Sequence, residues 1–78
     1  MEKQAHKYKM LGLKVAYYRK LKGFTQEQLA EKLGKSTQHI GALEAPNVLR
    51  TVSIGTLFDM SDLLGVPVYK FFQFDEDE

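Results

Sequence analysis

The sequence predicts a compact all-α fold of five helices around one core, and three observations support this prediction. Apolar residues recur at helical spacing in several separate stretches of the chain. The breaks between these stretches are short and carry glycine, proline, serine or threonine where helices would begin and end. No internal repeat or low-complexity linker interrupts them, and 78 residues are enough for one small domain.

The composition excludes several classes of protein. There is no cysteine, so the chain has neither disulfides nor thiolate metal ligands. No apolar run approaches the roughly 20 residues that a membrane-spanning helix needs. The N-terminus contains lysines but lacks the apolar core of a signal peptide. We therefore expect a cytoplasmic protein.

The net charge of +1 conceals an uneven distribution of charged residues. Residues 1–50 carry ten lysines and arginines and four acids, a net charge of +6. Residues 51–78 carry one base and six acids, a net charge of −5. A basic half suits a polyanionic partner such as a nucleic acid. The alternative is that the lysines only form a solvated helix face.

The first predicted helix runs from about Lys9 to Lys22 and is ended by Gly23. Residues 1–8 lack a clear period, so we expect them to form a flexible N-terminal arm. The row of this helix that is expected to face the core comprises Leu11, Val15 and Tyr18, with Leu21 as a further candidate.

A second apolar row on the same helix consists of Leu13, Tyr17 and Leu21. A helix in so small a domain rarely buries both rows. We therefore expect the aromatic C-terminal segment or a partner chain to cover the second row. The alternative is a set of scattered exposed apolar residues, which are common on protein surfaces.

Residues 25–44 predict two short helices joined by a tight turn. Thr25 suits the N-cap of the first, because its hydroxyl can accept an unpaired backbone N–H. Strong helix formers follow over Gln26–Leu33, and Gly34 tolerates the positive φ that commonly ends a helix.

Ser36 or Thr37 can cap the second of these helices, which should end near Glu44. Its residues Ile40 and Leu43 are expected to face inward. Two helices joined by a turn of three or four residues form a helix-turn-helix, whose second helix fits the major groove of DNA.

The remaining chain predicts two more helices. Pro46 stops the preceding helix, and Ser53 suits the N-cap of a helix over about Ile54–Leu64. Pro67 suits the first turn of a fifth, short helix over about 67–72. The inward residues of the fourth helix are expected to be Ile54, Leu57, Phe58 or Met60, Ser61 and Leu64. The domain should therefore span residues 9–74, followed by a solvated acidic tail over 75–78.

The chain resembles the lambda-repressor and Cro-like (XRE-type) helix-turn-helix family. The resemblance covers about residues 10–72 and rests on three segments of the sequence. These segments are LGLKVAYYRKLKGFTQEQLAEKLGKS, then IGALE, then SIGTLFDMSDLLGVP. The part TQEQLAEKLG is highly characteristic of the family, and the order of five helices also agrees.

The resemblance implies a set of DNA-contacting residues. Gln26 would bind a phosphate at the start of its helix. The recognition helix would run over about 37–44, and its first turn would present base-reading side chains. Gln38 could pair with adenine, and Thr37 could contact a base or a thymine methyl group. The full set of expected DNA contacts is Gln26, Lys35, Ser36, Thr37, Gln38, His39, Asn47 and Arg50.

The resemblance also implies a structural ion pair between Arg19 and Glu44, which would fix the recognition helix rather than touch DNA. The chain departs from the family at Gly41 and Ala42, where relatives often carry longer polar residues on the outward face of this helix. Lys35 stands where an apolar residue is usual and could add a phosphate contact. Direct readout is therefore expected to rest mostly on the first turn.

Other chemistry finds little support in the sequence. His6 and His39 lie in different elements and have no ligand partner at helical spacing, so no metal site is expected. Ser36 and His39 lie three residues apart but lack a third orienting group or an oxyanion loop. There is no glycine-rich phosphate loop. We expect neither an enzyme nor a bound cofactor.

The leading hypothesis is a sequence-specific regulator of transcription, in type a prokaryotic or phage repressor, that binds double-stranded DNA. We expect a homodimer, because one such module covers only a half-site. The expected dimer surface comprises Tyr69, Phe72 and Phe74. The main alternative is a protein-interaction module of the same fold, antitoxin-like or a regulatory partner. A weaker alternative is a DNA-binding subunit of a recombination or excision system.

Overall fold

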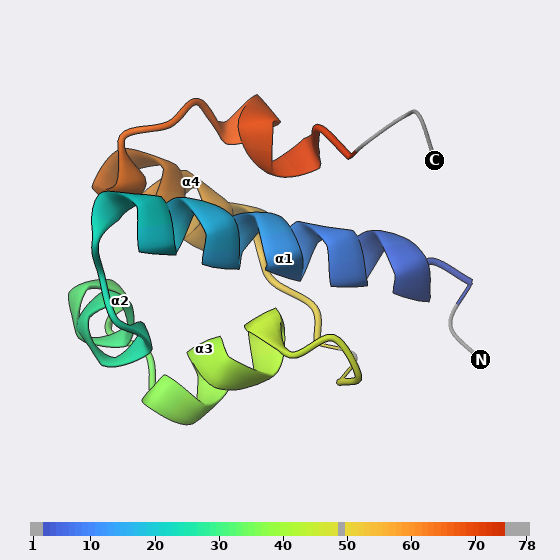
Figure 1. The fold of residues 1–78 in the computed structure, drawn as a ribbon, viewed down its shortest axis with the longest axis horizontal. Helices are drawn as coiled ribbons and strands as arrows, with labels where there is room; N and C mark the ends of the chain where they lie inside the picture. Colours follow the sequence, from blue (N-terminus) through green and yellow to red (C-terminus); the bar gives the residue numbers. More distant parts are fainter. Residues whose placement is uncertain (1–2, 49, 75–78) are drawn as a thin grey trace.

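The computed structural model describes residues 3–48 and 50–74 of the chain. These residues form four α-helices and one 3-10 helix, with no strand among them. Figure 1 shows α1 crossing the front of the molecule, α4 behind it, and α2 and α3 below. The helices are α1 Ala5–Lys22, α2 Gln26–Leu33, α3 Thr37–Glu44, α4 Ile54–Leu64 and the 3-10 helix η1 Val68–Phe72.

The prediction of five α-helices is wrong in its last element. Residues Val68–Phe72 form a 3-10 helix, in which the Lys70 N–H donates to the Pro67 carbonyl at 3.0 Å. Pro67 itself is extended and makes no side-chain cap. Five residues allow little more than one turn, and the tighter 3-10 geometry is common in such short segments.

The first helix begins earlier than predicted. The Gln4 carbonyl accepts hydrogen bonds from the N–H groups of Lys7 and Tyr8, so the backbone ladder starts well before Lys9. The predicted flexible arm over 1–8 is therefore helical from Ala5 onward. Residues 1–2 of that arm, and the acidic tail 75–78, lie outside the described residues.

One of the two rows of α1 faces the core. Leu11 and Val15 are buried and Tyr18 is half-buried, as predicted. The expectation that Leu21 also faces inward is wrong, since 69% of this residue is exposed. Leu21 lies on the outward row instead, because the helix turns it away from the packed neighbours of α1.

The helix-turn-helix forms with the predicted bounds. The Thr25 hydroxyl accepts from the Gln28 N–H, and the Gln28 side chain accepts from the Thr25 N–H, which completes a capping box. Gly34 ends α2 with φ of 69°. Ser36 then caps α3 by accepting the His39 N–H at 3.0 Å. Ile40 and Leu43 are buried, as predicted.

The bounds of α4 agree with the prediction, but its inward face is rotated. Leu57 and Leu64 are buried as expected, and Met60 rather than Phe58 is the third core residue. The expectation for Ile54 is wrong, because 58% of it is exposed. The core side of α4 takes Thr56 instead, whose hydroxyl accepts a hydrogen bond from Ser53. The prediction for Ser61 is met in part, since this residue is half-buried.

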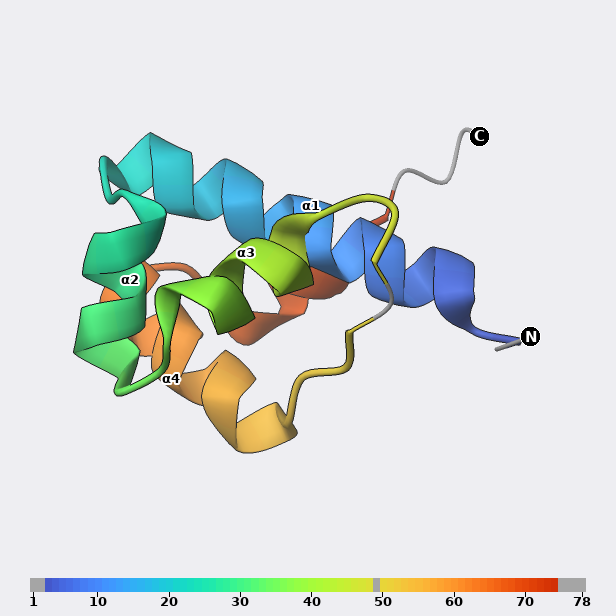
Figure 2. The ribbon, with the colours of Figure 1, turned by 90° about the horizontal axis from the view of Figure 1, so that it is seen from below.

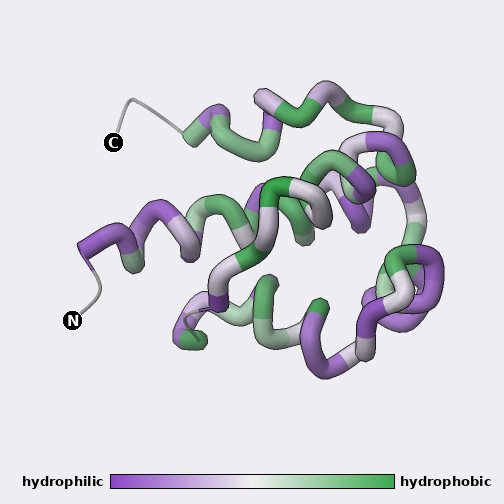
Figure 3. The backbone as a smooth tube through the Cα atoms, turned by 180° about the vertical axis from the view of Figure 1, so that it is seen from behind, coloured by the Kyte–Doolittle hydropathy of each residue, from purple (hydrophilic) through white to green (hydrophobic). Residues whose placement is uncertain are grey.

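The core lies between α1, α4 and the helix-turn-helix. Its fully buried side chains are Val15, Leu29, Ile40, Met60 and Phe71, so that every helix contributes one. Figure 3 shows hydrophobic residues along α4 and the C-terminal segment, and hydrophilic residues at the start of α3. The recognition helix is thus packed by its later residues while its first turn stays polar.

The backbones of α1 and α3 touch at one glycine. A Cβ atom at Gly12 would lie 2.0 Å from the Leu43 carbonyl oxygen, closer than any real side chain comes. Only glycine permits this approach. This role of Gly12 is not predictable from the sequence, because a glycine within a helix gives no local sign of its tertiary neighbours.

Candidate nucleic-acid interface

The first turn of α3 forms an exposed polar edge. Thr37 and Gln38 are exposed, and neither side chain makes a hydrogen bond with any described residue. Ser36 lies at the same edge, but its hydroxyl is engaged by the His39 N–H. Lys35 precedes the helix and is also exposed. Figure 2 shows α3 facing the viewer, with α1 on one side and α4 on the other.

A buried ion pair fixes the opposite end of α3. The Arg19 guanidinium donates from Nε to Glu44 Oε2 at 2.7 Å and from Nη2 to Glu44 Oε1 at 2.9 Å. Both residues are over nine-tenths buried. Two parallel bonds of this kind fix orientation as well as distance. The structure therefore brings the two residues together as the resemblance implied.

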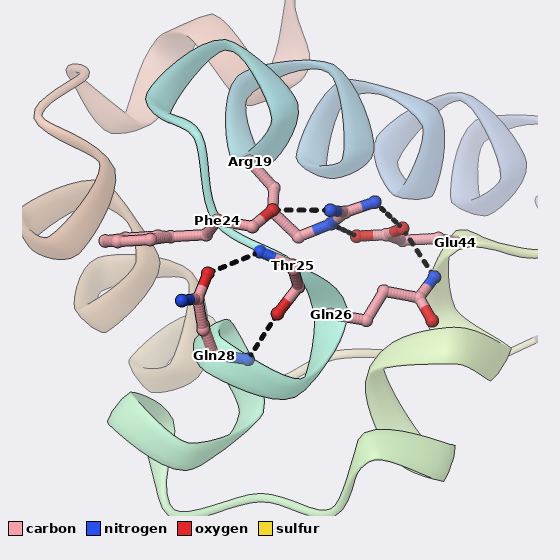
Figure 4. Close-up of polar contacts among 6 residues, drawn as sticks. All are labelled: Arg19, Phe24, Thr25, Gln26, Gln28 and Glu44. Atoms are coloured by element: carbon pink, nitrogen blue, oxygen red, sulfur yellow. Dashed lines mark hydrogen bonds and ion pairs between the residues drawn. The ribbon is translucent and has the colours of Figure 1, made fainter.

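The same ion pair reaches the turn before α2. Arg19 Nη1 donates to the Phe24 carbonyl at 2.7 Å, and the Gln26 amide donates to Glu44 Oε1 at 2.9 Å. Figure 4 shows these bonds joining the end of α1, the start of α2 and the end of α3. Among the described side chains, no buried nitrogen or oxygen lacks a partner. The network is thus fully hydrogen-bonded, as a buried charge requires.

Gln26 occupies the first position of α2 and is half-buried. Its amide nitrogen bonds Glu44, so one of its two N–H groups is already in use within the protein. The predicted phosphate contact would have to use the second N–H or the backbone. This internal bond, which was not predicted, ties the expected phosphate ligand to the buried ion pair.

The loop after α3 folds back on the recognition helix through Arg50. Its Nη1 lies 3.2 Å from His39 Nδ1, and since arginine can only donate, the imidazole accepts at that nitrogen. Arg50 is exposed and His39 is half-buried. The contact holds a guanidinium beside the first turns of α3. Asn47 is exposed in the same loop.

Gly41 and Ala42 are less outward than the sequence suggested. Both are half-buried. A Cβ atom at Gly41 would lie 3.5 Å from Gln26 Oε1, which is an ordinary van der Waals distance. This part of α3 therefore faces the start of α2, and the open polar edge is confined to residues 35–39.

The aromatic residues near the C-terminus are partly open. Tyr69 and Phe72 are exposed, while Phe74 is half-buried with its ring 6.5 Å from that of Phe72. They lie on η1 and just after it, whereas Figure 1 shows α3 on the other side of α1. A contact between two copies through these residues would leave the polar edge of α3 free.

The described part of the chain offers no residues for a metal site and no membrane-spanning helix. No group of three histidines, cysteines or acids there could hold a metal ion. No helix within it is long and apolar enough to cross a bilayer. A shallow depression of about 380 Å³ between α2 and α4 is lined by Lys32, Leu33, Asp59, Asp62 and Leu63.

Comparison with known proteins gives consistent matches. A helix-turn-helix family model matches residues 15–71. An uncharacterized HTH-type transcriptional regulator of Methanocaldococcus jannaschii is 38% identical over 65 residues, which cover 83% of this chain and 96% of the relative. The HTH-type regulator YazB of Bacillus subtilis, also uncharacterized, is 38% identical over 55 residues, covering 70% and 77% of the two chains.

Solved structures share the arrangement of helices. The master regulator for biofilm formation SinR, in complex with DNA, superposes with a TM-score of 0.70 at 33% identity, covering 78% of this chain and 95% of that one. The restriction-modification controller protein C.AhdI from Aeromonas hydrophila gives a TM-score of 0.80, covering 91% of this chain and all of the other. Its 22% identity is evidence for the fold alone.

Proposed function

Since the chain belongs to the helix-turn-helix family, we propose that it is a transcriptional regulator that binds double-stranded DNA with α3 in the major groove. The observation that carries this proposal is the open polar edge of α3. Thr37 and Gln38 point away from the core without a partner among the described residues, while the other end of the helix is fixed by Arg19 and Glu44. A DNA-binding regulator of this kind is not an enzyme.

The residues of the polar edge divide into two roles. Gln38 reads a base, with adenine as the best match for its amide, and Thr37 contacts a base or a thymine methyl group. Ser36 acts mainly through the helix cap, because its hydroxyl already accepts the His39 N–H. His39 accepts a hydrogen bond from Arg50 and so holds the guanidinium beside the DNA major groove.

The remaining residues bind the DNA backbone. Lys35 precedes α3 and Arg50 contacts His39, so both supply positive charge near the first turn of α3. Asn47 lies in the loop that carries Arg50. Gln26 contributes through the N–H groups that remain at the start of α2. Contacts of this kind set the register of the protein on DNA and are insensitive to sequence.

We propose further that the regulator acts as a homodimer and represses transcription. We also propose that it is cytoplasmic, where its DNA would lie. One module reads only a half-site, and two copies would place their recognition helices about one DNA turn, roughly 34 Å, apart. The proposed contact surface comprises Tyr69, Phe72 and Phe74.

A second candidate function is a protein-interaction module of the same fold. The observation that favours it is the lack of long side chains at Gly41 and Ala42, which confines DNA readout to one turn of α3. Under this alternative the polar edge would bind a protein. Affinity for duplex DNA would then be low and would not depend on salt concentration.

Binding to DNA fragments selected from a random duplex library tests the main proposal. We expect affinity for the selected site to fall steeply between 50 mM and 200 mM salt, because phosphate contacts release counterions. Gln38→Ala should weaken the binding free energy for the selected site by roughly 1–3 kcal/mol, and that for random DNA by much less. Arg50→Ala is the matched control, since it should weaken both about equally. Negligible binding at 50 mM salt would favour the protein-interaction module.

A further inference from the structure

The outward side of α1 carries an apolar row whose three residues all stay exposed in the described fold. Leu13, Tyr17 and Leu21 are 40%, 56% and 69% exposed. Spacing of four residues places them in one line along the helix, over a little more than two turns. Large apolar side chains exposed in a contiguous row commonly mark a contact site.

The aromatic C-terminal segment does not cover this row. It packs on the neighbouring side of α1, where the rings of Tyr18 and Phe71 meet at 6.0 Å. The rings of Tyr17 and Tyr18 meet edge to face, at 4.8 Å between centroids, and Tyr17 remains more than half exposed. The row was expected to be covered by the aromatic C-terminal segment or by a partner chain, so the partner chain remains.

The same helix is strongly basic. It contains no acid, and its bases are Lys7, Lys9, Lys14, Arg19, Lys20 and Lys22. Arg19 is neutralised by Glu44, in the one ion pair found among the described residues. Lys14 and Lys20 lie three residues before and after Tyr17, so they flank the middle of the apolar row.

This face is separate from the polar edge of α3. In Figure 1 α1 crosses the front of the molecule with α4 behind it, and in Figure 2, turned by 90°, α3 faces the viewer with α1 beside it. Gly12 and Arg19, which contact Leu43 and Glu44 of α3, lie roughly 140–160° around α1 from Tyr17, so the row faces away from α3. A partner on the row would leave the DNA-reading residues open.

We propose that the row Leu13, Tyr17 and Leu21, with its flanking lysines, binds an amphipathic helix of a partner protein that carries apolar residues bordered by glutamates or aspartates. An apolar row explains affinity for a helix face, and flanking charges of one sign select a partner of the other. A second copy of this chain is a poor occupant for the same face, because two such helices would bring their lysines together.

A titration with two synthetic peptides tests the proposal on the full chain. Both are 18-residue helices with leucines at three positions spaced by four, flanked by glutamates in one and by lysines in the other. We expect calorimetry to detect binding of the acidic peptide and none of the basic one. Tyr17→Ser with Leu21→Ser should weaken binding at least tenfold. The matched control is Ile54→Ser with Phe58→Ser, an exposed apolar pair on α4 without lysines, and it should bind as the wild type does.

A charge-reversed variant, Lys14→Glu with Lys20→Glu, keeps the apolar row and should reverse the preference between the two peptides. Equal binding of both peptides, no binding of either, or equal loss in the α4 control would overturn the proposal. It would also be overturned if the α1 variant lost self-association in sedimentation, or lost binding to duplex DNA or phosphatidylglycerol vesicles. Each of those results would assign the face to another occupant.

Discussion

Replacing Gly12 by alanine should destabilise the domain, because the added methyl group would collide with the backbone of α3. The added Cβ would lie 2.0 Å from the Leu43 carbonyl oxygen and 3.2 Å from the carbonyl carbon. These are backbone atoms, so relief requires α1 and α3 to move apart by more than 1 Å. Overpacking of this kind typically costs about 1–3 kcal/mol and occasionally more.

The net effect follows from two opposing terms. Alanine is favoured over glycine within a helix by about 1 kcal/mol, which offsets part of the clash. We place the clash at the upper end of its range, since no side chain can rotate away, and expect a loss of about 2 kcal/mol in the free energy of unfolding. For a domain of this size that corresponds to a fall of roughly 8–16 °C in Tm.

Urea and thermal denaturation followed by circular dichroism measure this change. Gly41→Ala is the matched control, because its Cβ would lie 3.5 Å from Gln26 Oε1, at ordinary contact distance. The free energy of unfolding of that variant should rise by up to about 1 kcal/mol, because alanine has the higher helix propensity. If Gly12→Ala is as stable as the wild type or more so, the close approach of α1 and α3 is refuted.

Two further predictions concern the ends of α3. Glu44→Gln should lower the free energy of unfolding by about 3 kcal/mol, because it leaves the Arg19 charge buried without a counterion; a loss below 1 kcal/mol in urea denaturation would argue against this role. Ser36→Ala should cost about 1 kcal/mol by removing the bond to the His39 N–H. The same variant should also bind DNA more weakly in a fluorescence anisotropy titration. Unchanged affinity would show that the cap does not order the polar edge of α3.

The sequence predicted those features of the fold that local chemistry decides. The bounds of α2, α3 and α4 follow from capping side chains such as Thr25, Ser36 and Ser53, whose partners lie three residues away. The early start of α1 was missed, because no side-chain cap marks it. The change of the fifth helix to a 3-10 turn was also missed, since a single turn can adopt either geometry at little cost.

Features that depend on distant contacts were harder to predict. On α4, apolar residues occur on more than one side, so spacing alone did not distinguish the exposed Ile54 and Phe58 from the buried Met60. Gly12 gave no local sign that it meets Leu43. The bond of Gln26 to Glu44 crosses 18 residues, and the contact of Arg50 with His39 crosses 11. Each of these depends on how the helices pack against one another.

The structure explains why the open polar edge of α3 lies at its start. Gly12 and Arg19 are seven residues apart, two turns of α1, and therefore share one face of that helix. They contact the adjacent residues Leu43 and Glu44, so these two residues of α1 fix α3 at its C-terminal end. Changes at this end should tilt the whole helix and weaken binding to all DNA sequences alike. Changes at Gln38, which has no partner within the described fold, should alter the preference among sequences instead.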